Sequence, residues 1–152
     1  MIKIKLVKLL IFFFLISACG YSPIFSNKEN NFSVVILSST GNNKLNKILE
    51  KKLSKYTGID NDKFFTLEID TKLNKTISTK DSKGNPKTFT ININSIILIK
   101  DSSGKLSEKK YYKSINYNNS DDKFDLHKYE NKIAKNLIEK ISEELIIYLQ
   151  SV

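Results

Sequence analysis

The chain offers few side chains that could act as nucleophiles, metal ligands or general bases. Among its 152 residues there is one cysteine, Cys19, and one histidine, His127. A single cysteine cannot form an internal disulfide or a cysteine metal cluster, and a single histidine cannot supply a histidine-rich metal site. We therefore expect no metal and no cofactor, and the first question is what Cys19 does.

Cys19 follows a segment with the order of a secretory signal peptide. Lys3, Lys5 and Lys8 precede an unbroken apolar run at 9–16, and no acidic residue occurs before the cysteine. Basic, apolar and small residues in that order are typical of an export signal. The run is too short to span a bilayer, which needs about 20 apolar residues. A buried strand or helix of the fold is the alternative interpretation.

The residues around Cys19 are more specific than an ordinary export signal. Residues 16–19, Ile-Ser-Ala-Cys, resemble the bacterial lipobox. The resemblance implies cleavage before Cys19, so that 1–18 is a lipoprotein signal peptide, and attachment of a diacylglycerol and a further acyl chain to Cys19. Three acyl chains would make a permanent anchor. Gly20 stands where enteric inner-membrane lipoproteins carry Asp, which favours the outer membrane. An ordinary signal peptide with a chance cysteine is the alternative.

The charge balance says less about partners than its size suggests. All 25 basic residues are lysine, against 16 acidic residues, giving a net charge of +9. Loss of 1–18 would leave 22 lysines and a net charge of +6. Lysine suits bidentate phosphate recognition less well than arginine, and an exported chain does not meet DNA or RNA. We therefore expect no nucleic-acid partner, and the length excludes a multidomain enzyme.

One polar loop concentrates lysines. Lys80, Lys83 and Lys87 lie within a turn at 80–87 that also holds Gly84 and Pro86. Such a cluster could attract an anionic ligand by simple charge attraction. The alternative is a solvated loop in a lysine-rich chain. A second group lies near the next hairpin: Lys105, Lys109 and Lys110.

The acidic residues suggest one enzymatic hypothesis and a simpler alternative. Glu68 and Asp70 share a strand face, a spacing found in catalytic carboxylate pairs, and His127 could complete a hydrolase site if it lay close to them. A solvated sheet face and a surface histidine explain the same residues. Asp121 and Asp122 stand before the last helix, where acids usually serve as caps. The sequence contains no G-x-S-x-G or H-E-x-x-H motif.

Hydrophobic periodicity predicts the elements. Residues 32–37 are rich in β-formers, and 43–56 repeat apolar residues at helical spacing. Alternation predicts strands at about 65–73, 89–99 and 106–117, with a hairpin loop at 101–104. A long amphipathic helix follows from about 123 to 150. Residues 19–31 contain Pro23 and polar residues, and we interpret them as a lipidated tether.

The order of these elements limits the architecture. A β-α-β-β-β-α chain with two amphipathic helices predicts an α+β fold, a two-layer α/β sandwich in which a mixed four-stranded sheet carries both helices on one face. Residues 32–152 then form a single domain. The other sheet face should be polar, and a binding module could use it. Its residues are Thr66, Glu68, Asp70, Thr90, Asn92 and Asn94.

The N-terminal residues carry a resemblance to a known family. Residues 15–25, Leu-Ile-Ser-Ala-Cys-Gly-Tyr-Ser-Pro-Ile-Phe, look like the start of LptE-family lipoproteins of the alphaproteobacterial type, in which the anchor cysteine is followed by Gly, an aromatic residue and a Pro–apolar–aromatic step. The expected order of strands and helices agrees over the whole mature chain.

This resemblance implies a binding function and no enzymatic activity. LptE plugs the large outer-membrane barrel LptD and assists insertion of lipopolysaccharide into the outer leaflet. The chain would then be an outer-membrane lipoprotein, anchored on the periplasmic side by Cys19, with an LptD-like barrel and lipopolysaccharide as partners. Lys80, Lys83 and Lys87 could meet lipopolysaccharide phosphates. The alternative is another small periplasmic lipoprotein, such as an auxiliary subunit of an ABC-type lipid transporter.

Overall fold

The predicted order of elements and fold class are confirmed. The computed structural model describes residues 31–58 and 60–152, so Cys19, the expected signal peptide 1–18 and all but the last residue of the expected tether 19–31 lie outside the described residues. The elements are β1 (Ser33–Gly41), α2 (Asn43–Leu53), the 3₁₀ turn η1 (Ser54–Tyr56), β2 (Phe64–Lys80), β3 (Pro86–Asp101), β4 (Leu106–Asn118) and α3 (Lys123–Ser151).

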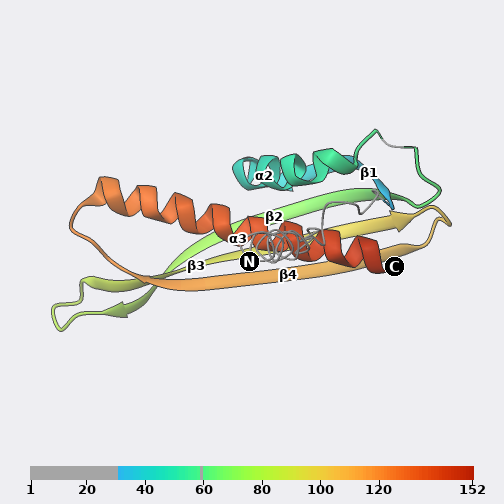
Figure 1. Ribbon diagram of the computed structural model, residues 1–152. Helices are drawn as coiled ribbons and strands as arrows, with labels where there is room; N and C mark the ends of the chain where they lie inside the picture. The colour runs from blue at the N-terminus through green and yellow to red at the C-terminus, as the bar shows by residue number, and fades with distance from the viewer. Residues whose placement is uncertain (1–30, 59) are drawn as a thin grey trace, which may run out of the picture.

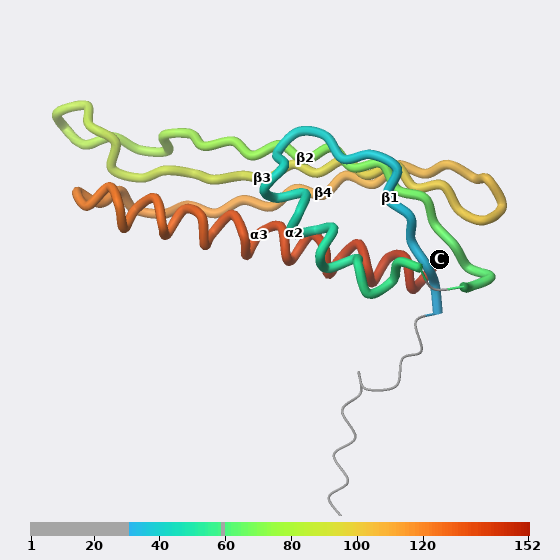
Figure 2. The backbone as a smooth tube through the Cα atoms, turned by 90° about the horizontal axis from the view of Figure 1, so that it is seen from above, coloured from blue at the N-terminus to red at the C-terminus, as the bar shows by residue number. Residues whose placement is uncertain are grey.

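The four strands form one mixed sheet in the order β1-β2-β3-β4. β1 and β2 run parallel and are connected through α2, whereas β2–β3 and β3–β4 are antiparallel hairpins. Both helices lie on the same face of the sheet (Figures 1 and 2). A bulge at Leu37 shifts the register of β1, since Ile36 pairs with Leu67 and Ser38 with Glu68.

The core fills the layer between this sheet face and the helices. Alternate residues of β2 and β3 point into it, as the period of two requires, and the apolar stripe of α3 covers them. The largest fully buried side chains are Phe32, Leu49, Leu53, Leu67, Ile69, Ile93, Ile97, Ile99, Ile138, Ile141, Leu145 and Leu149. Residues from β1 to the last turn of α3 thus share one core.

Side chains cap the starts of both helices. The Asn42 side chain accepts a hydrogen bond from the Leu45 N–H at 3.1 Å, and that of Asp122 accepts one from the Asp125 N–H at 2.9 Å. Such caps satisfy backbone donors that have no partner within the helix. Asp122 therefore caps α3, as its place before the helix predicted. After η1 the chain turns at Gly58, whose φ is 70°.

β2 and β3 are longer than the alternation predicted. Beyond Leu73, where β1 has ended, the two strands continue beside β4, which pairs with β3 as far as Thr88, and only the tip of their hairpin projects past the sheet (left of Figure 1). Polar side chains pair across this extension: Thr79 with Thr88 at 2.7 Å, and Asn74 with Asn92 at 3.3 Å. Because residues 74–80 on the β2 side are mostly polar, the hydrophobic pattern does not reveal the extension of that strand.

The sandwich has two different ends. At one end, which we call the entry end, β1 begins beside the start of β2, with the Ser33 N–H donating to the Lys63 carbonyl oxygen at 2.9 Å. The β3–β4 loop and the C-terminus of α3 lie at the same end (Figures 1 and 2). The opposite end is formed by the tip of the β2–β3 hairpin.

Candidate functional site

The lysines at 80–87 come together at the hairpin tip. Lys80, Lys83 and Lys87 are all exposed. Asp81 shapes the turn between them, since its carboxylate accepts the backbone N–H groups of Lys83 and Asn85, each at 2.8 Å. The turn therefore fixes the backbone that carries the lysines while leaving their side chains in water.

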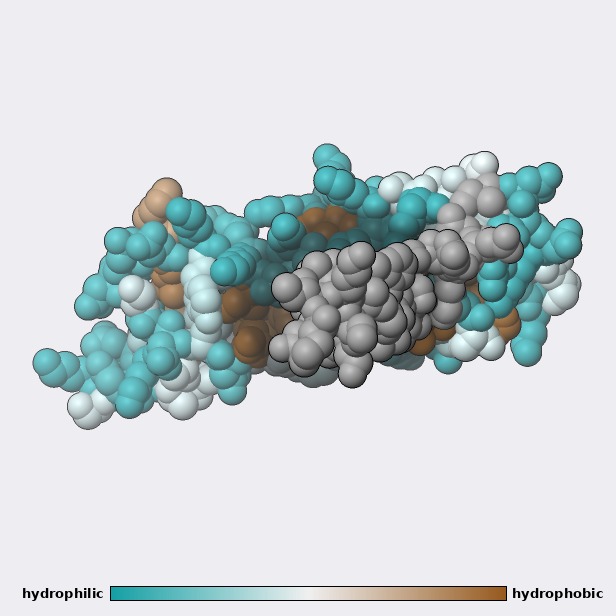
Figure 3. All heavy atoms as spheres, in the orientation of Figure 1, coloured by the Kyte–Doolittle hydropathy of each residue, from teal (hydrophilic) through white to brown (hydrophobic). Residues whose placement is uncertain are grey.

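The hairpin tip carries an excess of positive charge. Hydrogen bonds, first from the backbone N–H of Asn85 and then from its side chain, hold the pKa of Asp81 below its ordinary value, so this carboxylate is ionised and offsets one lysine. Within the described residues no acid forms an ion pair with the three lysines. The projecting hairpin is hydrophilic in Figure 3. The three lysine ammonium groups act as point charges that can attract phosphate groups.

A cluster around Glu130 ties α3 to the hairpin. The Glu130 carboxylate accepts hydrogen bonds from the Lys75 ammonium and the Tyr117 hydroxyl, both at 2.6 Å. Burial alone would raise the pKa of Glu130, but these two donors outweigh it and the pKa is lowered. The Lys75 ammonium also lies 4.2 Å from the centre of the Phe89 ring. These contacts set the position of the base of the hairpin relative to the helix.

The sheet face away from the helices is polar near the hairpin and partly apolar near the entry end. Thr90 and Asn92 lie on this face toward the hairpin, as predicted, and Asn74 bonds to Asn92 there. Near the entry end, Val35 and Leu98 are 45% and 42% exposed. The face thus combines hydrogen-bonding and apolar patches. Such a mixture is better suited to binding another protein than to binding a small substrate.

The three residues of the hydrolase hypothesis do not come together. Glu68 and Asp70 line a shallow hollow of about 200 Å³ on the open sheet face. His127 is an exposed residue of α3, which packs on the opposite face. The two carboxylates share a face as predicted, but no histidine reaches them.

Burial, followed by the charge of Glu144, raises the pKa of Tyr111 to about 12, so this phenol stays neutral at ordinary pH.

The sequence did not predict a further cationic feature, a groove between the two helices. Lys47, Lys51, Lys52 and Lys135 line it over Ile48. Lys52 pairs with Glu139 at 3.7 Å, whereas none of the other three pairs with an acid of the described residues. The spacing of Lys47 and Lys51, four residues apart, indicated a shared helix face. That Lys135 of α3 lies beside these lysines became evident only from the packing of the two helices.

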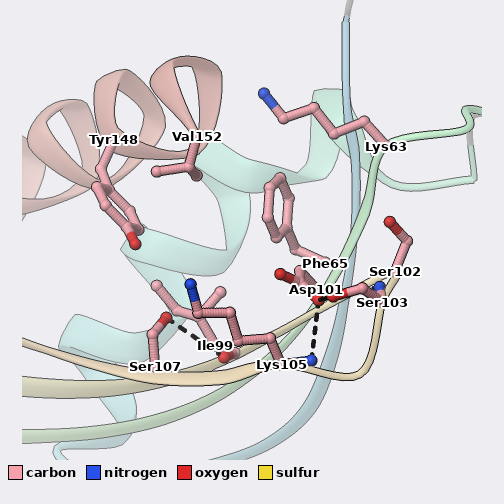
Figure 4. A pocket seen from close by; sticks show the side chains of 10 residues that line it. All are labelled: Lys63, Phe65, Ile99, Asp101, Ser102, Ser103, Lys105, Ser107, Tyr148 and Val152. Atoms are coloured by element: carbon pink, nitrogen blue, oxygen red, sulfur yellow. Dashed lines mark hydrogen bonds between the residues drawn. The ribbon is translucent and has the colours of Figure 1, made fainter.

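A slot opens between α3 and the sheet at the entry end. Figure 4 shows the Phe65 ring at its centre, Tyr148 and Val152 descending from α3, and Lys63 and Lys105 at its rim. Its volume is about 280 Å³. The Lys109 ammonium lies 4.1 Å from the centre of the Tyr148 ring, and the Lys63 ammonium donates to the Gln150 carbonyl oxygen at 3.2 Å. The slot therefore has an apolar floor and a polar rim, in which Lys63 and Lys105 stand beside Asp101.

The described part of the chain has neither a cluster of metal-ligating residues nor a membrane-spanning helix. Over residues 31–58 and 60–152 no three His, Cys, Asp or Glu side chains gather as metal ligands would. None of the helices in these ranges has the length and apolar character needed to cross a membrane.

Comparison with known proteins identifies the fold. Rare lipoprotein B from Shewanella oneidensis has a TM-score of 0.60 and 10% identity over 77% of this chain and 95% of that one. A minor lipoprotein from Acinetobacter baumannii has a TM-score of 0.56 and 12% identity over 81% and 92%. Lipoprotein B from Nitrosomonas europaea has a TM-score of 0.55 and 11% identity over 76% of this chain and 80% of that one. No family model and no curated protein matches the chain in sequence. At these identities the likeness shows the fold alone.

Proposed function

We propose that this chain is an outer-membrane lipoprotein that binds and plugs an LptD-like β-barrel and assists assembly of lipopolysaccharide at the outer membrane. The observation that carries the proposal is the fold shared with several bacterial lipoproteins, found in a chain whose single cysteine stands in a lipobox-like motif. Its role is binding, and it needs no metal or cofactor.

The two ends of the sandwich fit this role. The chain reaches the domain at the entry end, so the lipid on Cys19 would hold that end near the inner leaflet. The hairpin tip, with Lys80, Lys83 and Lys87, lies at the opposite end and would extend away from the anchor. The open sheet face, with its polar and apolar patches, is available to the wall of a barrel. Lipopolysaccharide phosphates would then meet the hairpin lysines.

The anchor is tested by Cys19→Ser. Without the thiol no diacylglycerol can be attached, and each buried CH₂ of an acyl chain contributes about 0.8 kcal/mol to membrane binding. We expect the variant to leave the outer-membrane fraction, and the intact mass of the wild-type mature chain to include the acyl groups. Ser22→Ala is the control and should remain in the membrane. Wild-type protein that begins at Met1 or has an unmodified Cys19 would contradict the proposal.

The lipopolysaccharide contact is tested by replacing Lys80, Lys83 and Lys87 together with glutamine. Each exposed charge pair contributes about 0.5 kcal/mol, so three lost contacts should weaken binding of purified lipopolysaccharide about tenfold. The change removes charge while the turn hydrogen bonds of Asp81 remain. The dissociation constant of the purified chain is the measurement.

The groove between the helices supplies a matched control for this experiment. The variant Lys47→Gln, Lys51→Gln, Lys135→Gln removes the same charge from another surface. We expect it to change the dissociation constant for lipopolysaccharide by less than about threefold. If the groove variant loses binding and the hairpin variant retains it, the hairpin is not the contact.

A further inference from the structure

The sheet has two edges, which differ in how their main-chain groups are covered. β1 and β4 are the edge strands, since the strand order is β1-β2-β3-β4 (Figure 1). An edge strand leaves a row of main-chain N–H and C=O groups without partners in the sheet, and a further strand can pair with them. Folded proteins interrupt or cover such edges where pairing is not wanted.

The β1 edge is short, interrupted and partly covered. β1 has 9 residues, and the bulge at Leu37 shifts its register against β2. Contacts from α2 cover the end of the strand: the Asn46 side chain donates to the Thr40 carbonyl oxygen, and the Ser39 hydroxyl donates to the Glu50 carboxylate, each at 2.7 Å. A strand that approached this edge would meet a broken register and an acceptor already in use.

The β4 edge is long and regular. All 13 residues of β4 pair with β3 without a shift, from Leu106 opposite Lys100 to Asn118 opposite Thr88. Strands of globular proteins usually have about five or six residues. β4 contains neither Pro nor Gly, which commonly interrupt edge strands. Its outer row of main-chain groups is therefore continuous and can accept another strand.

The charges of β4 determine which kind of strand can pair there. Residues 105–113 hold Lys105, Lys109, Lys110 and Lys113 but only one acid, Glu108. An antiparallel pair of two copies would bring two such lysine-rich segments into one ladder, and like charges close together across a ladder are destabilising. The lysines therefore disfavour a second copy of this chain. An acidic strand would meet opposite charges in the same place.

We propose that the β4 edge is a docking site for an extended acidic segment of a partner protein, which adds to the sheet as a fifth strand. Main-chain hydrogen bonds would supply affinity, and the lysines would select acidic side chains. The Lys109 ammonium lies 4.1 Å from the centre of the Tyr148 ring, which holds this charge beside the edge without an acid. A lipid or a free phosphate cannot form a main-chain ladder, so the partner is a polypeptide.

Fluorescence anisotropy of a labelled peptide tests the proposal. The protein is the chain from residue 19 onward with Cys19→Ser, so that no acyl chain takes part. The probe is a short peptide of repeated Val-Glu-Glu triplets, which carries glutamates on both faces of an extended strand. Two further versions carry N-methyl groups on alternate residues, at the odd or at the even positions. Because alternate N–H groups of a strand point to the same side, only one version loses the donors that face β4.

We expect one methylated peptide to bind within about threefold of the parent peptide, and the other to bind about tenfold more weakly or worse. Lys110→Glu should weaken binding of the parent peptide about fivefold, because it reverses a charge on the edge strand. Lys72→Glu is the matched control, with an expected change below about twofold. Lys72 lies on the interior strand β2, is 66% exposed against 68% for Lys110, and is likewise paired with an acid.

Four results would overturn the proposal. The parent peptide might not bind, or the two methylated peptides might bind equally, which would mean that charge attraction alone holds them. Lys110→Glu and Lys72→Glu might weaken binding equally. A dimer of the purified chain in sedimentation, formed in place of the peptide complex, would make a second copy the occupant. The assay requires neither the lipid anchor nor the barrel, so its failure and the failure of the proposed function are distinguishable.

Discussion

Replacing Gly41 with alanine should destabilise the fold by roughly 2 to 5 kcal/mol. Gly41 ends β1 with a φ of 85°, a backbone conformation that costs a residue with a side chain about 1–2 kcal/mol. An added Cβ would also stand 2.9 Å from the Asp70 side-chain oxygen and closer still to the Thr71 carbonyl oxygen. That carbonyl accepts the Asn42 N–H at 2.7 Å, which connects the N-cap of α2 to the sheet.

The closest contact of the added Cβ is the Thr71 backbone carbonyl oxygen, so a rotamer change cannot relieve it. The chain must either shift β1 relative to β2 or break the hydrogen bond from Asn42 to Thr71, and both changes disturb the start of α2. Losing a buried hydrogen bond costs about 1–3 kcal/mol, in addition to the cost of the positive φ.

Gly104 provides a matched control for Gly41→Ala. Its φ is also 85°, but nothing lies within 4 Å of the Cβ that alanine would add. Gly104→Ala should therefore cost only about 1–2 kcal/mol. Urea denaturation of the two variants beside wild type measures the difference. Equal losses in the two variants would show that the close approach at Gly41 is not a constraint on the fold.

The second large effect is expected at Glu130. Glu130→Ala leaves the Tyr117 hydroxyl and the Lys75 ammonium without their acceptor. The Tyr117 residue is only 5% exposed, so its hydroxyl cannot recover a full set of hydrogen bonds from water. We expect a loss of roughly 2–3 kcal/mol in the free energy of unfolding. Glu144→Ala, which removes the more exposed pair with Lys113, should cost less than about 1 kcal/mol.

The pH dependence of stability provides an independent measurement on Glu130. Its pKa is lowered in the folded protein from the ordinary value of 4.5. Its contribution is therefore fully present above about pH 4.5, and it is lost as the pH falls through the folded pKa. Wild type should lose stability over that acidic range, and Glu130→Ala should lose less. Parallel curves for the two proteins would contradict the assigned role of Glu130.

The architecture was predictable because its signals are apolar and periodic. The stripe of α3 and the alternation at Phe65, Leu67 and Ile69 predicted the two-layer sandwich, and the structure confirms it. The extension of β2 and β3 was not predicted, because residues such as Thr79 and Thr88 pair by hydrogen bonds and leave no period-two hydrophobic pattern. The sheet order and the parallel pairing of β1 with β2 likewise depend on tertiary packing.

The site was predictable only where residues are neighbours in the chain. Lys80, Lys83 and Lys87 share one turn, so their proximity followed from the sequence. The groove of Lys47, Lys51 and Lys135 joins two helices. This combination arises only when α3 packs beside α2. Cys19 lies outside the described residues, so its lipidation stays a prediction.

Copurification from the outer membrane tests the proposed function most directly. The chain would carry a C-terminal tag, the outer membrane would be extracted in mild detergent, and the bound proteins would be identified and quantified by mass spectrometry. We predict one large β-barrel protein in a stoichiometric amount. An inner-membrane transporter in its place, or no partner at all, would contradict the plug function. Such a result would leave the fold and the proposed lipid anchor unaffected.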